Sequence, residues 1–83
     1  MAKLRVATAQ EIPEIQNIFT EAWNFLKRFY YLKQDSGQEE WNECLRAYSR
    51  VAQMGTTPSS KELASALAQT VFRYIEFRSK ERD

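Results

Sequence analysis

Hydrophobic residues recur at helical spacing along three stretches of this chain. They are Ile12, Ile15, Phe19, Ala22, Trp23, Leu26, Phe29 and Tyr30; then Trp41, Cys44, Leu45, Tyr48, Val51 and Ala52; then Leu63, Ala64, Leu67, Ala68, Val71, Phe72, Tyr74 and Ile75. Steps of three and four residues place side chains on one face of an α-helix. The pattern predicts amphipathic helices over about 9–33, 38–54 and 59–79, with residues 1–7 as a short arm.

Polar residues between these stretches mark where the helices begin and end. Three pairs have the spacing of a capping box, in which Ser or Thr and a Glu three residues later satisfy free backbone N–H groups: Thr8 with Glu11, Ser36 with Glu39, and Ser59 with Glu62. Thr57-Pro58 is an alternative start for the third helix, because proline suits a first helical turn. Gly55 follows the second helix, where a residue able to adopt positive φ is favoured.

Three amphipathic helices joined by short loops predict an all-α fold, a three-helix bundle with antiparallel neighbours. With 83 residues, the chain has room for one domain. The predicted core is Ile15, Phe19, Leu26, Trp41, Leu45, Tyr48, Leu63, Leu67 and Val71.

Composition and charge narrow the class of protein. Hydrophobic residues make up 43% of the chain and the net charge is +1, a balance typical of a folding domain. A net charge this small gives no strong electrostatic attraction to nucleic acid. Neither a membrane-spanning apolar run nor a signal peptide is visible, so we expect a cytoplasmic protein without a membrane partner.

The residues that usually carry catalysis are scarce. The chain has no histidine, which removes the commonest general base and a frequent zinc ligand. Its one cysteine, Cys44, falls on an apolar helix face and is expected to be buried. Glu39, Glu40 and Glu43 suit the start of a helix through its dipole. We therefore expect no enzyme activity, no cofactor and no metal site.

Aromatic residues are abundant and crowd the end of the first helix. Successive residues of a helix point about 100° apart, so neighbouring aromatic side chains cannot all face one small core. One interpretation is a core with one or two exposed tyrosines. The other is an exposed patch for a dimer or a partner protein. The candidate interface residues are Phe25, Tyr31 and Phe77, with the cations Lys27 and Arg28.

The chain resembles small helical proteins of Firmicutes and their prophages at Ile12-Pro13, Ala22–Tyr30, Trp41, Tyr48 and Leu63–Ala64. The resemblance implies a compact helical fold and a phage or prophage origin, and it carries no site residues. The leading hypothesis is a non-catalytic helical protein–protein interaction module. It would act by homo-oligomerisation, or by binding and inhibiting a host protein.

Two shorter resemblances point elsewhere. Residues 55–67 are similar to the start of a helix-turn-helix in LexA-type winged-helix repressors, which implies a nucleic-acid-binding segment over 55–75 as the alternative function. Residues 68–72 continue the helical pattern without a turn, so the motif is incomplete. Residues 5–22 resemble the opening of GNAT acetyltransferases, but the Gly-rich acetyl-CoA segment of that family has no counterpart here, and we reject it.

Overall fold

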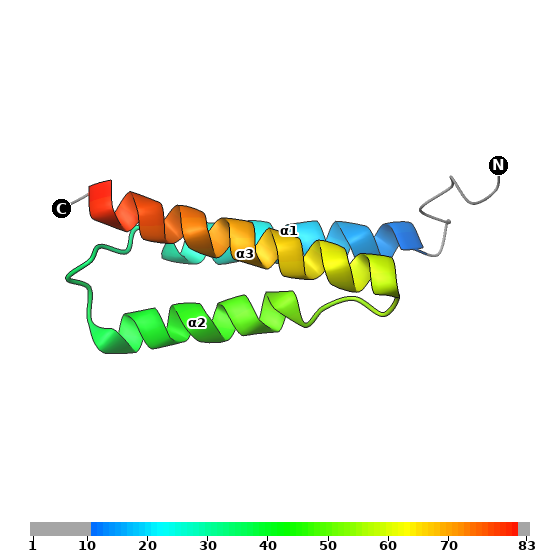
Figure 1. Cartoon of the computed structure of the whole chain (residues 1–83), viewed down its shortest axis with the longest axis horizontal. Coiled ribbons are helices and arrows are strands. Elements are labelled where there is room, and N and C mark those ends of the chain that lie inside the picture. Colours follow the sequence, from blue (N-terminus) through cyan, green and yellow to red (C-terminus); the bar gives the residue numbers. More distant parts are fainter. Residues whose placement is uncertain (1–10, 82–83) are drawn as a thin grey trace.

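The computed structural model describes residues 11–81, and this part of the chain forms three helices and no strand. The helices are α1 (Glu11–Phe29), α2 (Gln38–Ala52) and α3 (Pro58–Glu81). Each helix contacts the other two. Figure 1 shows α2 running opposite to α1 and α3, which lie side by side in the same direction. The predicted all-α three-helix bundle is therefore confirmed.

The first helix ends earlier than expected, at Phe29 instead of Lys33. The N–H of Leu32 donates to the Phe29 carbonyl (3.1 Å), so the chain tightens into a turn directly after the helix. This turn places the Leu32 side chain fully inside the core. The Trp41 indole N–H then donates to the Lys33 carbonyl (3.2 Å), and this hydrogen bond links the segment between the two helices to α2.

The start of α2 is capped one residue later than predicted. Gly37 is the N-cap, and the Glu40 carboxylate accepts a hydrogen bond from the Gly37 N–H (3.2 Å). The predicted Ser36 and Glu39 pair is wrong, because the Ser36 hydroxyl instead accepts from the Lys33 N–H (2.9 Å) and closes the preceding turn. The Thr8 and Glu11 pair, the arm over 1–7 and the helix start at residue 9 lie outside the described residues.

The start of α3 follows the Thr57-Pro58 alternative. The Ser60 N–H donates to Thr57 Oγ1 (3.1 Å), and the Thr57 N–H donates to Ser60 Oγ (3.0 Å), so the two residues cap the helix reciprocally. The predicted Ser59 and Glu62 pair is wrong. Gly55 has a φ of 101°, as its position after α2 predicted.

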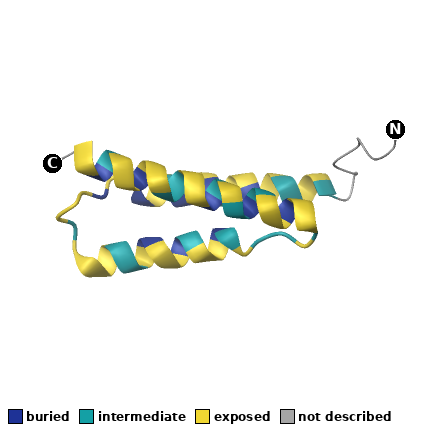
Figure 2. Cartoon of the chain, viewed as in Figure 1, coloured by how far each residue is buried: buried dark blue, intermediate teal, exposed yellow. Residues whose placement is uncertain are grey.

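The core shares Ala22, Phe29, Cys44 and Val51 with the predicted apolar faces of α1 and α2, and it adds Ile18, Phe25 and Ala47, which were not among them. The buried hydrophobic residues are Ile18, Ala22, Phe25, Phe29, Leu32, Cys44, Ala47, Val51, Ala64, Ala68 and Ile75, and Figure 2 shows the buried positions gathered between the helices. Small residues line the inner side of α3, since Ala64 and Ala68 are fully buried there. Short side chains at such a contact allow helices to approach closely.

Two residues of the predicted core lie outside it. Phe19 is 50% exposed and Leu45 is 47% exposed. Each follows a fully buried residue, Ile18 or Cys44, and a step of one residue turns a helical side chain by about 100°. The other predicted core residues are half-buried: Ile15, Leu26, Trp41, Tyr48, Leu63, Leu67 and Val71.

Candidate interaction surface

Phe25 was expected on an exposed interface, and the structure corrects this expectation. Its side chain is only 3% exposed, and its ring packs edge-on against Phe29 with centroids 5.9 Å apart. Residue 25 shares a helical face with Ala22 and Phe29, which are also buried. Phe25 therefore stabilises the core and is not available to a partner.

Tyr31 and Phe77, two of the candidate interface residues, are exposed. The Tyr31 hydroxyl donates to the Glu40 carboxylate (3.4 Å), so this side chain spans the α1–α2 connection. Phe77 is the most exposed large hydrophobic residue of residues 11–81, at 62%. It lies nine residues after the fully buried Ala68, which turns it to the opposite side of α3.

Lys27 and Arg28 lie on different flanks of α1. The Lys27 ammonium stands 6.0 Å from the centre of the Trp23 ring, on the side of α3. The Arg28 guanidinium lies 3.7 Å from the Glu43 carboxylate of α2. The two cations therefore belong to two separate surfaces and do not form one basic patch.

An aromatic groove runs between α1 and α3. It has a volume of about 460 Å³ and is lined by Trp23, Leu26, Lys27, Tyr30, Tyr74 and Arg78. Arg78 donates to the Tyr74 hydroxyl (3.0 Å), and its guanidinium lies 5.8 Å from the centre of that ring. This hydrogen bond raises the pKa of Arg78 above its ordinary value, so the side chain stays charged. The groove is apolar with two cations at its rim.

The groove belongs to a longer apolar stripe on α1. Its residues are separated by seven, four, three and four positions: Ile12, Phe19, Trp23, Leu26 and Tyr30. Leu26 is half-buried, and the other four are exposed, with Trp23 at 58%. A second stripe at the same spacing, from Ile18 through Ala22 and Phe25 to Phe29, packs inside the bundle. We use the term α1/α3 face for Ile12, Phe19, Trp23, Leu26 and Tyr30 of α1 together with Tyr74 of α3.

Sequence reasoning assigned much of this exposed stripe to the core. The signal that could have separated the two stripes is the width of the apolar arc on α1. Ile18 and Phe25 complete one stripe with Ala22 and Phe29, which leaves Phe19 and Trp23 to a second one. A helix that only covers a core needs a single stripe.

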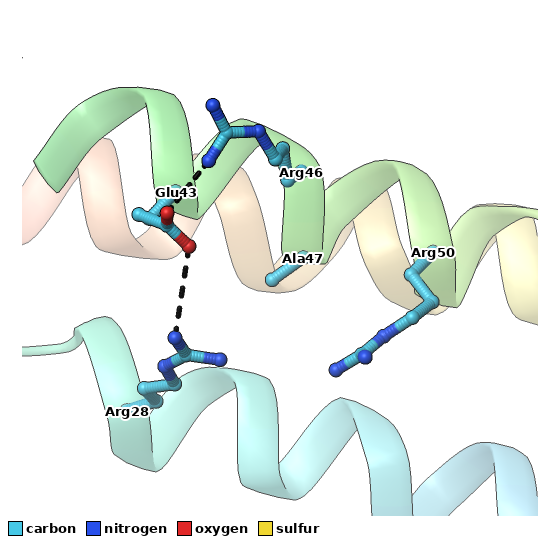
Figure 3. A pocket seen from close by; sticks show the side chains of 5 residues that line it. All are labelled: Arg28, Glu43, Arg46, Ala47 and Arg50. Carbon is cyan, nitrogen blue, oxygen red and sulfur yellow. Dashed lines mark hydrogen bonds and ion pairs between the residues drawn. The ribbon is translucent and has the colours of Figure 1, made fainter. Parts of the chain in front are cut away.

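A second cleft lies between α1 and α2 (Figure 3). Its volume is about 290 Å³, and it is lined by Arg28, Glu43, Arg46, Ala47 and Arg50. The Glu43 carboxylate accepts from Arg46 (2.6 Å) and pairs with Arg28 (3.7 Å). We call this site the arginine cleft.

Cys44 is buried, as expected from its place on the apolar face of α2. Burial, and secondarily the negative charge of Glu76, raise the pKa of its thiol to about 12. A thiol with this pKa stays protonated at neutral pH, and the thiolate is the reactive form. Across residues 11–81, no three His, Cys, Asp or Glu residues are grouped to hold a metal ion.

The segment 55–75 does not contain two helices. Within it the structure has a short connection, and α3 then runs without interruption from Pro58 to Glu81. A helix-turn-helix requires a second helix after the turn.

None of the helices over residues 11–81 has the length and apolar character needed to cross a bilayer.

Comparison with known proteins gives no family for this chain. Models of protein families, curated proteins and solved structures were compared with it, and none matches. The phage or prophage origin stays a prediction.

Proposed function

We propose that this chain is a non-catalytic helical interaction module that pairs with a second copy of itself through the α1/α3 face. The observation that carries the proposal is the exposed stripe on α1, whose spacing matches that of the stripe packed in the core. Contiguous apolar patches of this kind mark interaction sites in folded proteins. Its lone thiol and lack of disulfide partners suit the cytoplasm, where we place the module.

The stripe has the pattern that a second helix requires. Alternating steps of three and four residues allow side chains of two helices to interlock along a seam. The positions are 12, 16, 19, 23, 26 and 30, and only Gln16 among them is polar. In an antiparallel pair centred between Phe19 and Trp23, Ile12 would meet the partner's Tyr30. Each apolar residue would then find an apolar counterpart, except Leu26, which would meet the partner's Gln16.

Charge favours the antiparallel arrangement over the parallel one. Both cations of the groove, Lys27 and Arg78, lie toward the same end of the α1/α3 face. A parallel pair would place the two Lys27 ammonium groups side by side. An antiparallel pair separates them by about 18 Å along the helix axis, beyond the screening length of about 8 Å at physiological salt.

Sedimentation velocity across a concentration series tests the proposal. We expect a dimer for the unaltered protein and a dissociation constant at least about tenfold weaker for Trp23→Gln, since an aromatic residue at the centre of an interface is usually critical. Leu45→Gln is the matched control, because Leu45 is also a half-exposed apolar residue but lies on α2.

The effect of Trp23→Gln is judged against the Leu45→Gln control and against the helix content of each protein. Circular dichroism should show the same helix content for all three proteins. A monomer at every concentration would overturn self-pairing, as would equal weakening by Trp23→Gln and Leu45→Gln. A monomer that instead binds a duplex oligonucleotide at low salt would favour the alternative function.

A further inference from the structure

The arginine cleft lies on the flank of α1 that faces α2, away from the α1/α3 face, and its charges are not balanced. Glu43 pairs with Arg28 and with Arg46, so one carboxylate serves two guanidinium groups. Arg50 has no carboxylate within 4 Å among the described residues. The residues lining the cleft therefore carry two positive charges more than negative ones.

The two arginines that flank the centre of the cleft face each other. Figure 3 shows Arg28 extending from α1 and Arg50 extending from α2 toward the same gap, beside Ala47. Two like charges directed into one gap repel each other, and an anion placed between them would reverse the sign of the interaction. Glu43 holds Arg28 by its ion pair, which fixes one side of the gap.

The shape of the cleft limits what can enter it. Ala47 is the smallest residue of the lining and is buried, so its side chain leaves the space between the guanidinium groups open to solvent. A guanidinium is planar, always charged, and matches the oxygens of a phosphate with two parallel donors. An anion of phosphate size could accept hydrogen bonds from both sides.

A carboxylate next to the arginine cleft disfavours a long polyanion as its ligand. Glu21 of α1 lines the adjoining pocket together with Arg28, Ala47 and Arg50, and it lines a further pocket with Arg50. A nucleic-acid strand that continued past the arginine cleft would bring its next phosphate toward this carboxylate. A single phosphate group held between Arg28 and Arg50 brings no further phosphate toward Glu21.

We propose that the arginine cleft binds one phosphate group, either free phosphate or the phosphate of a small monoester, between Arg28 of α1 and Arg50 of α2. Glu43 acts as a positioning residue for Arg28 and lowers the affinity through its negative charge. This site is independent of the proposed pairing surface.

Titration of the ¹⁵N-labelled protein with inorganic phosphate tests the site, with ionic strength held constant by sodium chloride. We expect saturable shifts at the amides of Ala47 and Arg50 and at the Arg28 side chain. Arg28→Gln and Arg50→Gln should each weaken binding by about tenfold or more, because each removes a charge-assisted hydrogen bond. Arg73→Gln, which removes an exposed charge from α3, should leave binding unchanged.

Two further arms separate specific binding from general charge screening. Glu43→Gln should tighten phosphate binding, and binding should strengthen from pH 5 to pH 8, because a phosphate gains its second charge near pH 6 while arginine stays charged. A parallel titration with phenyl phosphate distinguishes a monoester ligand from free phosphate by which one binds more tightly. Either preference supports the site.

Three results would overturn the proposal. The first is the absence of saturation with both probes. The second is an equal loss of affinity in Arg50→Gln and Arg73→Gln. The third is a single-stranded oligonucleotide that binds the cleft more tightly than either small phosphate, which would make a polyanion the ligand. All of these are read without reference to the oligomeric state, so failure here is distinguishable from failure of self-pairing.

Discussion

Lys27 and Arg28 are neighbours in the chain, yet they lie on opposite flanks of α1. The Lys27 ammonium lies over the Trp23 ring beside α3, and the Arg28 guanidinium pairs with Glu43 of α2. Successive helical residues diverge by about 100°, and the buried stripe of α1 separates their two flanks. One helix thus contributes to the core, to the α1/α3 face and to the arginine cleft.

The assignment of Phe25 to the core predicts a large loss of stability on truncation. Phe25→Ala removes a ring that is 3% exposed, and we expect the free energy of unfolding to fall by about 3–5 kcal/mol. Phe19→Ala is the matched comparison, since Phe19 lies on the same helix but is half exposed, and it should cost much less. Urea denaturation measures both. Similar losses for the two variants would mean that the face of α1 is wrongly assigned.

The backbone at Gly55 predicts a second stability effect. Its φ of 101° disfavours any residue with a side chain, and a Cβ there would lie 2.7 Å from backbone atoms of Ser60 and Lys61. We expect Gly55→Ala to lower the free energy of unfolding by at least about 1–3 kcal/mol. Gly37→Ala is the control, because a Cβ at Gly37 would meet only a Glu40 oxygen at 3.9 Å. An equal effect in thermal unfolding would contradict this account.

The reciprocal cap of α3 predicts coupling between Thr57 and Ser60. Each residue accepts a hydrogen bond from the backbone N–H of the other. Loss of such a cap typically costs about 0.5–2 kcal/mol, so Thr57→Ala should destabilise the protein by about 1 kcal/mol. In a double-mutant cycle with Ser60→Ala, the two losses should be less than additive. Fully additive losses would show that the two side chains act independently.

The pKa of Cys44 predicts how stability changes at alkaline pH. The folded thiol has a pKa of about 12, whereas its usual value is 9.0, so above pH 9 the unfolded chain loses a proton that the folded chain retains. Stability therefore falls as pH rises from 9 toward 12, with a slope approaching about 1.4 kcal/mol per unit from this group. Below pH 9 the group contributes no slope.

The control for this prediction is Cys44→Ala, which removes the thiol. Tyrosines and lysines also titrate in this range, so the measurement is the difference between the two proteins in urea denaturation at several pH values. We expect the unaltered protein to lose stability more steeply than Cys44→Ala. Parallel pH profiles would mean that the thiol ionises as readily in the folded protein as in the unfolded one.

The number of helices could be predicted from the sequence because the apolar spacing and the breaks around Gly37 and Gly55 are local features. The inner face of α1 was predicted only in part, because two apolar stripes lie beside each other on this helix and Ile18 and Phe25 were not assigned to the buried one. Which of the two stripes is buried depends on the residues opposite, such as Ala64 and Ala68, and so on packing between distant segments. The exact caps were missed for a similar reason, since neighbouring polar residues compete for the same backbone groups.

The two surfaces differ in how far the sequence revealed them. Surplus aromatic residues predicted an interface, and the proposed α1/α3 face could be defined only after Phe25 was found to be buried. The arginine cleft had no sequence signal, because Arg28 and Arg50 are distant in the chain and line one cleft only through the packing of α1 on α2.

The most direct test of self-pairing is the distance between two spin labels, one on each copy, attached at Ile12→Cys in a protein that also carries Cys44→Ala. In the antiparallel pair, residue 12 of one copy lies beside residue 30 of the other. The two labels should therefore be separated by the rise from residue 12 to residue 30, about 27 Å. Pulsed electron paramagnetic resonance should give a distance distribution centred near that value. A separation of about 10 Å, the spacing of two parallel helices in contact, or no dipolar coupling at all, would contradict the account.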